Sequence, residues 1–212
     1  MTRYLRREIE AVRRTPRAGL LSSLVRVRDE ADALSDEELL AMVFLLLLAG
    51  HETTVHLLDG ALVCLDRRPD VRDACRVDPS LLPSFIDETL RHFAPVQLSK
   101  PRFVTRDATL AGEPLRRGQS VIAVLASANR DPARFADPDV FDPARSPNPH
   151  LTFGSGPHVC LGLKLARIEA EVALTRLLDR CPDVRLAVPA EELPWLKRPG
   201  LRAVARLPVR LS

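Results

Sequence analysis

A cysteine in a glycine-containing loop is the residue whose setting most favours chemistry. Cys160 lies in the segment 153–162, which reads FGSGPHVCLG. The glycines before it let backbone approach a flat ligand closely. The cysteine directly precedes a segment of helical character, and the amide donors and positive end of a helix favour a thiolate. Taken alone, the loop leaves a purely structural cysteine open, which is the commoner role of a lone cysteine near glycines.

Three further stretches precede this loop in the chain. Residues 49–54 read AGHETT, residues 88–91 read ETLR and residues 143–145 read PAR. ETLR is weak by itself, because pairs three residues apart are common on surface helices. In this order, and with LKLARIE after the loop, the set resembles the cytochrome P450 family. The resemblance extends from about Tyr4 to the end. Complete members are far longer and begin upstream, so residues 1–212 are identified with the C-terminal, heme-binding part.

The resemblance implies a heme b cofactor and assigns residues to it. Cys160 is then the thiolate ligand of the iron, an arrangement that favours O–O bond cleavage. Arg102 and His158 match positions that bind the heme propionates, and arginine suits a carboxylate through its two-pronged donors. For Arg102 the alternative is an exposed strand residue. The remaining positions expected at the cofactor are Phe153, Gly154 and Gly162.

The AGHETT segment matches the family's oxygen-activating motif. By resemblance, the Thr53 hydroxyl and the Glu52 carboxylate relay protons to dioxygen. Gly50 leaves room for a small ligand, and the site would suit a local bulge in the helix. The alternative is that Thr53 and Thr54 bond back to their own helix.

A structural role is implied for three charged residues. Glu88 and Arg91 lie three residues apart and so share a helix face. By resemblance they join Arg145 in a buried cluster that fixes the cysteine loop. A buried carboxylate between two guanidinium groups would be fully paired.

One metal-binding alternative is excluded. His51, Glu52 and His56 are similar to part of a zinc-protease helix, but that motif needs histidines four residues apart. Here they are five apart, which puts them on different faces.

The hydrophobic periodicity predicts a mainly helical chain. Ser35 and Glu38 form a capping box at the start of a long helix over 36–66, which Pro69 stops. Its middle is apolar almost all round, so we expect it to cross the interior. The other predicted helices are Tyr4–Arg14, Leu20–Arg28, Val71–Val77, a helix starting at Pro83 and ending before Pro95, and Gly162–Asp179.

The remaining segments predict a small β portion. Runs at Arg102–Thr105 and Ser120–Val124 flank glycine turns, and the tail from Pro182 alternates apolar residues with arginine. Residues 129–149 hold five prolines in 21 residues and predict an ordered but irregular loop. The fold class is therefore mainly α with a small β portion, and the resemblance implies an incomplete cytochrome P450 fold.

Composition restricts the partners. There are 31 basic and 28 acidic residues, a balance that gives no case for nucleic acid. The apolar run Leu39–Gly50 is shorter than the roughly 20 residues that span a bilayer, so we expect a buried helix and no membrane association. The four cysteines show no paired spacing, and the charged N-terminus has no secretory core. We therefore expect a cytoplasmic protein.

By resemblance, the activity is a monooxygenase that inserts one atom of dioxygen into a small organic substrate. Electrons would come from a ferredoxin and its ferredoxin reductase, because no flavin or nicotinamide motif is present. Lys164 and Arg167 are the predicted docking face for an acidic ferredoxin. The alternative is that one of them is solvated and the other paired within the protein. The other hypothesis for the whole chain is a non-catalytic, heme-binding or helical remnant.

Overall fold

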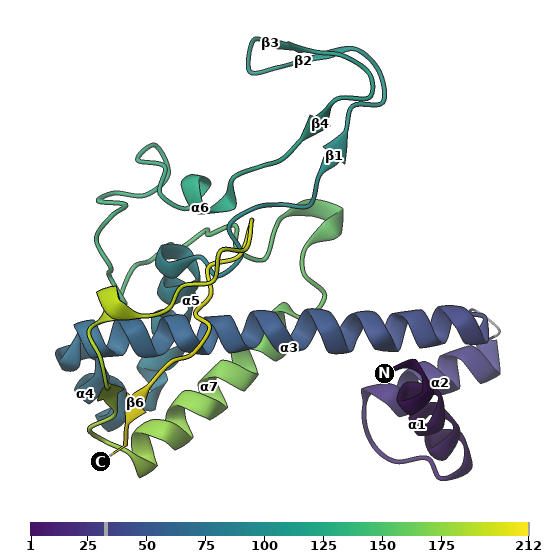
Figure 1. Cartoon of the computed structure of the whole chain (residues 1–212), viewed down its shortest axis with the longest axis horizontal. Helices are drawn as coiled ribbons and strands as arrows, with labels where there is room; N and C mark the ends of the chain where they lie inside the picture. The colour runs from purple at the N-terminus through teal and green to yellow at the C-terminus, as the bar shows by residue number, and fades with distance from the viewer. Residues whose placement is uncertain (32–33, 212) are drawn as a thin grey trace. The chain divides into compact units, whose positions relative to one another are not determined.

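The computed structural model describes residues 1–31 and 34–211, which divide into two compact units, Met1–Glu52 and Thr53–Ser212. The predicted fold class, mainly α with a small β portion, is confirmed (Figure 1). The helices are α1 (Thr2–Arg14), α2 (Leu20–Ala31), α3 (Asp36–Arg67), α4 (Pro69–Val77), α5 (Leu82–Phe93), α6 (Leu125–Ala128) and α7 (Leu163–Arg180). The strands are β1 (Arg102–Phe103), β2 (Ala108–Leu110), β3 (Glu113–Leu115), β4 (Ser120–Val121), β5 (Arg185–Leu186) and β6 (Val209–Arg210).

The first unit is built from α1, α2 and the beginning of α3. Its helices bury one apolar cluster, whose fully buried members are Leu5, Ile9, Val12, Val25, Leu39 and Leu40. The predicted capping box is present at the start of α3. The Glu38 carboxylate accepts from the Ser35 backbone N–H at 2.7 Å, and the Glu38 N–H donates to the Ser35 hydroxyl at 3.2 Å. These bonds satisfy backbone donors that a helix start otherwise leaves unpaired.

The expected burial of the whole run Leu39–Gly50 is wrong. Leu39 and Leu40 are buried, whereas Leu45 and Leu48 are 58% and 52% exposed. Only one side of this part of α3 packs within the first unit, on the cluster formed with α1 and α2. The remaining apolar side chains are therefore left facing outward.

Helix α3 is α-helical from Asp36 to Arg67, one residue beyond the predicted end. The helical bulge expected near Gly50 is not present in the structure. Residues 49–54 are α-helical throughout. No proline interrupts the helix. Pro69 is the first residue of α4, where its missing N–H costs nothing.

The second unit has the larger core. The end of α3, α4, α5 and α7 pack their apolar faces together, and Val184 after α7 completes the cluster. The contributions are Leu57, Ala61, Cys64 and Leu65 from α3, Val71 and Cys75 from α4, Leu82, Phe85, Ile86 and Leu90 from α5, and Ala170, Leu174 and Leu178 from α7. This core holds α5 against α7, the two helices that position the cysteine loop.

Helix α7 is apolar on two sides. Ala170, Leu174 and Leu178 face the core, whereas Leu165, Ile168 and Val172 are 52–57% exposed. The exposed three are spaced by three and four residues and so form one stripe along the helix, which we call the α7 stripe.

In the part of the chain that the structure describes, the β portion is three separate two-stranded antiparallel sheets. In Figure 1 an arm extends from the region after α5, with β1 and β4 along it and β2 and β3 at its tip. Arg102 pairs with Val121 in the first sheet. The β2–β3 hairpin was not predicted. Its two turn residues, Ala111 and Gly112, both have positive φ, the conformation that suits a two-residue hairpin.

The C-terminal tail contains less strand than predicted. In the described residues after α7, up to residue 211, only β5 and β6 pair, with Arg185 opposite Arg210, and two isolated bridges join Val96 to Leu201 and Trp195 to Val204. Prolines break the alternating pattern and remove ladder donors, so the tail is mostly irregular. Residues 129–149 carry no helix or strand, as predicted.

Candidate functional site

The cysteine loop is a compact turn in front of α7. The Cys160 N–H donates to the Phe153 carbonyl at 2.8 Å, which closes the loop at its base. Gly154 and Gly156 have φ of 73° and 72°, a left-handed conformation that favours glycine. Gly162 is the residue before α7, and a Cβ there would lie 3.9 Å from the Cys160 Sγ. The loop thus presents its cysteine just before the start of a helix.

Cys160 differs from the other cysteines in exposure. It is exposed, whereas Cys64 and Cys75 are buried and Cys181 is intermediate. Burial raises the pKa of the Cys64 thiol to about 12 and that of Cys75 to about 11, so both stay protonated near neutral pH. Among the four cysteines, Cys160 is therefore the thiol best placed to bind a metal ion from outside the protein.

Two buried polar residues, neither of them predicted from the sequence, tie the loop to α5. The Asn129 amide donates to the Thr152 hydroxyl at 3.0 Å and accepts from the Leu151 N–H at 2.7 Å. The Thr152 hydroxyl in turn donates to the Leu90 carbonyl in α5 at 2.6 Å. Asn129 is 39 positions from Leu90 in the chain, so no local pattern could identify this connection.

Glu88, Arg91 and Arg145 lie together in the structure. Arg91 donates to both carboxylate oxygens of Glu88 at 2.7 Å, and both side chains are fully buried. Arg145 Nε approaches the same carboxylate at 3.4 Å. The carboxylate also accepts from the Asp142 N–H at 2.8 Å and the Asn148 amide at 3.1 Å. The buried charge is therefore paired and hydrogen-bonded on every side, as such a charge requires.

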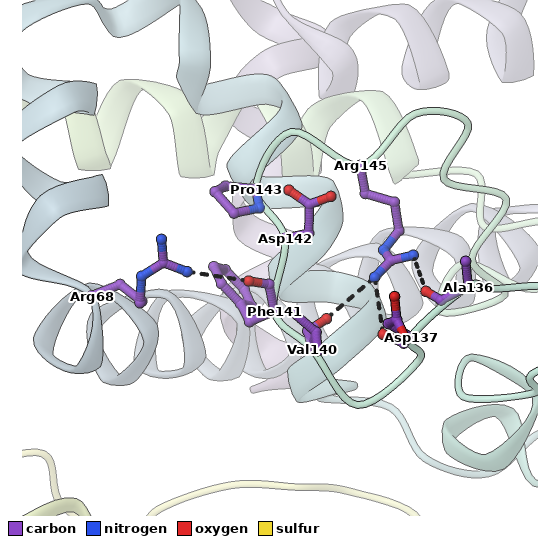
Figure 2. Close-up of a pocket in the computed structure, with 8 residues that line it drawn as sticks. All are labelled: Arg68, Ala136, Asp137, Val140, Phe141, Asp142, Pro143 and Arg145. Atoms are coloured by element: carbon purple, nitrogen blue, oxygen red, sulfur yellow. Dashed lines mark hydrogen bonds between the residues drawn. The ribbon is translucent and has the colours of Figure 1, made fainter.

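The two arginines hold the irregular loop 129–149 by its backbone. Besides its bonds to Glu88, Arg91 donates to the carbonyls of Asn129, Pro138 and Val140 at 2.7–2.9 Å, so all five of its N–H groups are used. Figure 2 shows Arg145 donating to the carbonyls of Ala136, Asp137 and Val140, and Arg68 to that of Phe141. The segment 129–149 has no helix or strand, so its conformation is fixed by hydrogen bonds from side chains. Arg68 and Arg91 donate from outside the segment, and Arg145 donates from near its end.

Arg102 and His158 are both exposed, on β1 and in the loop respectively. Glu52 and Thr53 are consecutive and half-buried on α3, with Glu52 ending the first unit and Thr53 beginning the second.

The predicted docking face for an electron donor is altered by the structure. Lys164 is exposed, but Arg167 Nε donates to the Asp87 carboxylate at 2.8 Å. The alternative in which one of the two is solvated and the other is paired within the protein therefore describes the structure.

The residues present suit a heme. An exposed thiol at a helix start is the donor that a thiolate-ligated iron needs, and Gly162 places no Cβ beside that thiol. Within residues 1–31 and 34–211 no group of three or more His, Cys, Asp or Glu side chains could hold a bare metal ion.

Comparison with known proteins decides the family. The profile described as "Cytochrome P450" matches residues 2–185. The chain belongs to the cytochrome P450 family. It is 42% identical over 208 residues to the biotin biosynthesis cytochrome P450 of Bacillus subtilis strain 168, covering 97% of this chain and 51% of that protein. It is 44% identical over 211 residues to the cytochrome P450 monooxygenase PikC of Streptomyces venezuelae, covering 99% and 51%.

Solved P450 structures share the fold. The structure of P450BioI in complex with an acyl carrier protein carrying hexadec-9Z-enoic acid has a TM-score of 0.89 at 39% identity, covering 100% of this chain and 53% of that chain. The structure of PksS of Bacillus subtilis 168 has a TM-score of 0.91 at 37% identity, covering 100% and 54%. The chain therefore spans about half the length of the P450 relatives it matches.

Helix α3 is the one helix in the described residues that is long and apolar enough to cross a membrane by length and composition, with a mean hydropathy of 1.5 over 18 residues, 17% of them buried. The chain is nevertheless homologous to soluble bacterial P450s.

Proposed function

We propose that this chain supplies the thiolate side of a cytochrome P450 monooxygenase, which inserts one atom of dioxygen into a small organic substrate. Cys160 is the ligand of the iron of heme b. The observation that carries the proposal is the exposed thiol of Cys160, held at the start of α7 by the bond from its N–H to the Phe153 carbonyl. Bound heme supplies the oxygen chemistry, and the protein supplies the ligand, the electrostatics and the protons.

Each of the chain's own residues then has a definite task. Arg102 and His158 orient the cofactor by donating to its propionate carboxylates. Gly154 and Gly162 leave room for a flat ring at the thiolate face, and the Phe153 carbonyl accepts the Cys160 N–H. The Glu52 carboxylate takes up protons, and the Thr53 hydroxyl passes them to the oxygen-binding side. Glu88, Arg91 and Arg145 are structural, since they hold residues 129–149 beneath the loop.

Relatives indicate the kind of substrate. P450BioI is described with an acyl carrier protein carrying a fatty acid, CYP109E1 with testosterone and CYP267B1 with myristic acid. We infer a substrate of similar character, small, organic and largely apolar. The electrons come from a ferredoxin and its reductase in the cytoplasm, with neither nucleic acid nor membrane as a partner.

The electron donor docks on the cysteine side, and Lys164 contributes to that surface. Lys164 is exposed on the first turn of α7, four residues after the ligand. An acidic ferredoxin would be attracted there, with an association that weakens as salt is added. Arg167 is paired with Asp87 and contributes less.

A non-catalytic, heme-binding or helical remnant is the second candidate function. The observation in its favour is the exposed apolar surface of α3 and α7, which a complete enzyme would be expected to cover. In that case the chain would bind heme without oxidising a substrate.

The absorption spectrum of the reduced, carbon monoxide-treated protein tests the ligand. Heme is added to residues 1–212, reduced and treated with carbon monoxide. A thiolate-type spectrum is expected, and Cys160→Ser should abolish it while Cys181→Ser leaves it intact. A histidine-type spectrum, or a Cys160→Ser spectrum like that of the unmodified chain, would contradict the assignment. A thiolate-type spectrum without substrate oxidation, once the rest of the fold is supplied, would favour the remnant.

A further inference from the structure

A second acidic residue of α5 connects three parts of the second unit. Asp87 precedes Glu88, and its Oδ1 accepts from Arg167 Nε of α7 at 2.8 Å. The same oxygen lies 3.5 Å from His150 Nε2, just before the cysteine loop. Burial raises the pKa of Asp87, but the bonds from His150 and Arg167 outweigh it, so the pKa lies below its ordinary value. Asp87 is therefore an anion that holds a histidine and an arginine in place.

Those two partners lie against one aromatic ring. The Arg167 guanidinium carbon is 4.9 Å from the centroid of the Phe153 ring, and the His150 ring centroid is 5.8 Å from it. The arginine is thus within the distance at which a cation is attracted to an aromatic face. Phe153 also packs against the main core. Its ring is held by the core, by Arg167 and by His150.

The backbone of Phe153 holds Cys160. The Phe153 carbonyl accepts the Cys160 N–H at 2.8 Å. The Cys160 side chain is exposed, so packing does not fix its position. This backbone bond therefore fixes the part of the loop that presents the Cys160 side chain, and the carbonyl that accepts it belongs to the residue whose ring contacts Arg167 and His150.

We propose that Asp87 is a positioning residue for Cys160, acting through Arg167, His150 and Phe153 to fix the loop that presents the thiol. The proposal rests on the proposed role of Cys160 as the iron ligand. The two neighbouring carboxylates of α5 then have different roles. Glu88 organises residues 129–149, and Asp87 organises the loop that follows them. The side chains of Asp87 and Arg167 are each about one-third exposed, so their pairing should affect local order more than global stability.

Amide hydrogen exchange on the heme-free chain, residues 1–212, tests the positioning directly. Asp87→Ala should speed exchange of the Cys160 amide by about fivefold or more, as expected when a hydrogen-bonded element loses its support. The Leu174 amide in the buried face of α7 should exchange at an unchanged rate. Asp87→Glu should restore most of the protection. Asp70→Asn removes a comparable anion, paired with Arg68 at 2.7 Å, and should leave Cys160 unaffected.

A second variant covers the case in which Asp87→Ala does not fold. Arg167→Lys keeps the positive charge beside Asp87 but removes the planar group from the Phe153 ring, and it should also speed Cys160 exchange. Unchanged exchange in a folded Asp87→Ala or Arg167→Lys chain would overturn the proposal. So would equal acceleration at Cys160 and Leu174, which would show a general loss of stability.

The spectrum of the heme-loaded chain then separates the two proposals. If the unmodified chain gives a thiolate-type spectrum, Asp87→Ala should reduce the thiolate-ligated fraction about fivefold, and Asp70→Asn should not. An unchanged fraction would overturn the positioning role. If the unmodified chain gives no thiolate-type spectrum, the assignment of Cys160 as ligand fails, and the exchange experiment still decides whether Asp87 positions the loop.

Discussion

Arg91 donates one hydrogen bond to each carboxylate oxygen of Glu88, both at 2.7 Å, and neither side chain is exposed to solvent. Glu88→Ala would leave two guanidinium groups facing an empty site. Removing one partner of a buried ion pair costs about 3–5 kcal/mol. We expect a loss of this size in the free energy of unfolding, measured with urea.

The control for Glu88 is an exposed pair. Glu191 lies 3.3 Å from Arg67, with both side chains more than half exposed, so Glu191→Ala should cost less than about 1 kcal/mol. Equal small losses for the two variants would show that the Glu88 cluster contributes nothing special to folding.

Gly60 of α3 lies against Phe93, the last residue of α5. A Cβ there would lie 2.5 Å from the Phe93 ring, which is itself buried beside Trp195 and Arg202. Gly60→Ala should gain about 1 kcal/mol of helix propensity but lose about 1–3 kcal/mol to overpacking, for no gain or a net loss. Gly50→Ala is the matched control, because its Cβ meets nothing within 4 Å. Thermal unfolding should rank Gly50→Ala above Gly60→Ala, and the reverse order would contradict the contact.

His92 should make stability depend on pH. Burial lowers the pKa of His92 below the ordinary 6.5, and the charges of the nearby Arg130 and Arg91 lower it further. The hydrogen bond with the Asp139 carbonyl raises the pKa but does not outweigh these effects. The unfolded chain then binds more protons than the folded chain below about pH 6.5, so stability falls as the pH falls towards the folded pKa. His92→Gln should flatten this part of a stability–pH curve. A curve unchanged by His92→Gln would sink the idea.

Thr53 and Glu52 should control proton delivery once the rest of the fold is present. In a hybrid with the remaining half of PikC, Thr53→Ala should keep heme but lower product per reducing equivalent by about tenfold or more, with hydrogen peroxide released instead. Glu52→Gln should act in the same direction. Thr54→Ala, the next residue along, serves as the control. If neither single variant changes the coupling, neither residue relays protons.

The chain alone should self-associate and bind heme weakly. The α7 stripe and the exposed leucines of α3 give it more apolar surface than soluble monomers normally show. Replacing Leu165, Ile168 and Val172 by Gln should shift sedimentation towards monomer. Changing the scattered Val77 and Leu110 to Gln should have little effect. A monomeric, tightly heme-loaded unmodified chain with coupled turnover would refute the expectation.

The sequence predicted the helices well because their signals are local. A capping box, apolar spacing and prolines identify the bounds of α3 and α5 within a few residues. Burial of α3 was mispredicted because an all-round apolar helix says nothing about which faces have neighbours. The β2–β3 hairpin was missed because Ala111, unlike glycine or asparagine, gives no sign of a positive φ.

The site was predicted only as far as motifs extend. The motifs identified the loop and the ETLR residues, but the order of motifs in the chain does not give the distances between their side chains. Asp87, Asn129 and Thr152 were missed because each acts on a residue more than 20 positions away. In the sequence, an aspartate beside a helical glutamate is indistinguishable from an ordinary surface charge. Its bond to Arg167 exists only because α7 packs against α5.

The bonding of Arg91 has a consequence for how this protein can change over generations. All three of its partners in the loop 129–149 are backbone carbonyls, which every amino acid provides. The shape of the loop is therefore specified from α5, and the loop's own side chains are comparatively free to drift. Lysine at position 91 would offer three donors from a single nitrogen, and it could not replace the five donors of the planar guanidinium group. Substitutions should thus accumulate readily at Pro138 and Val140, while one arginine remains irreplaceable.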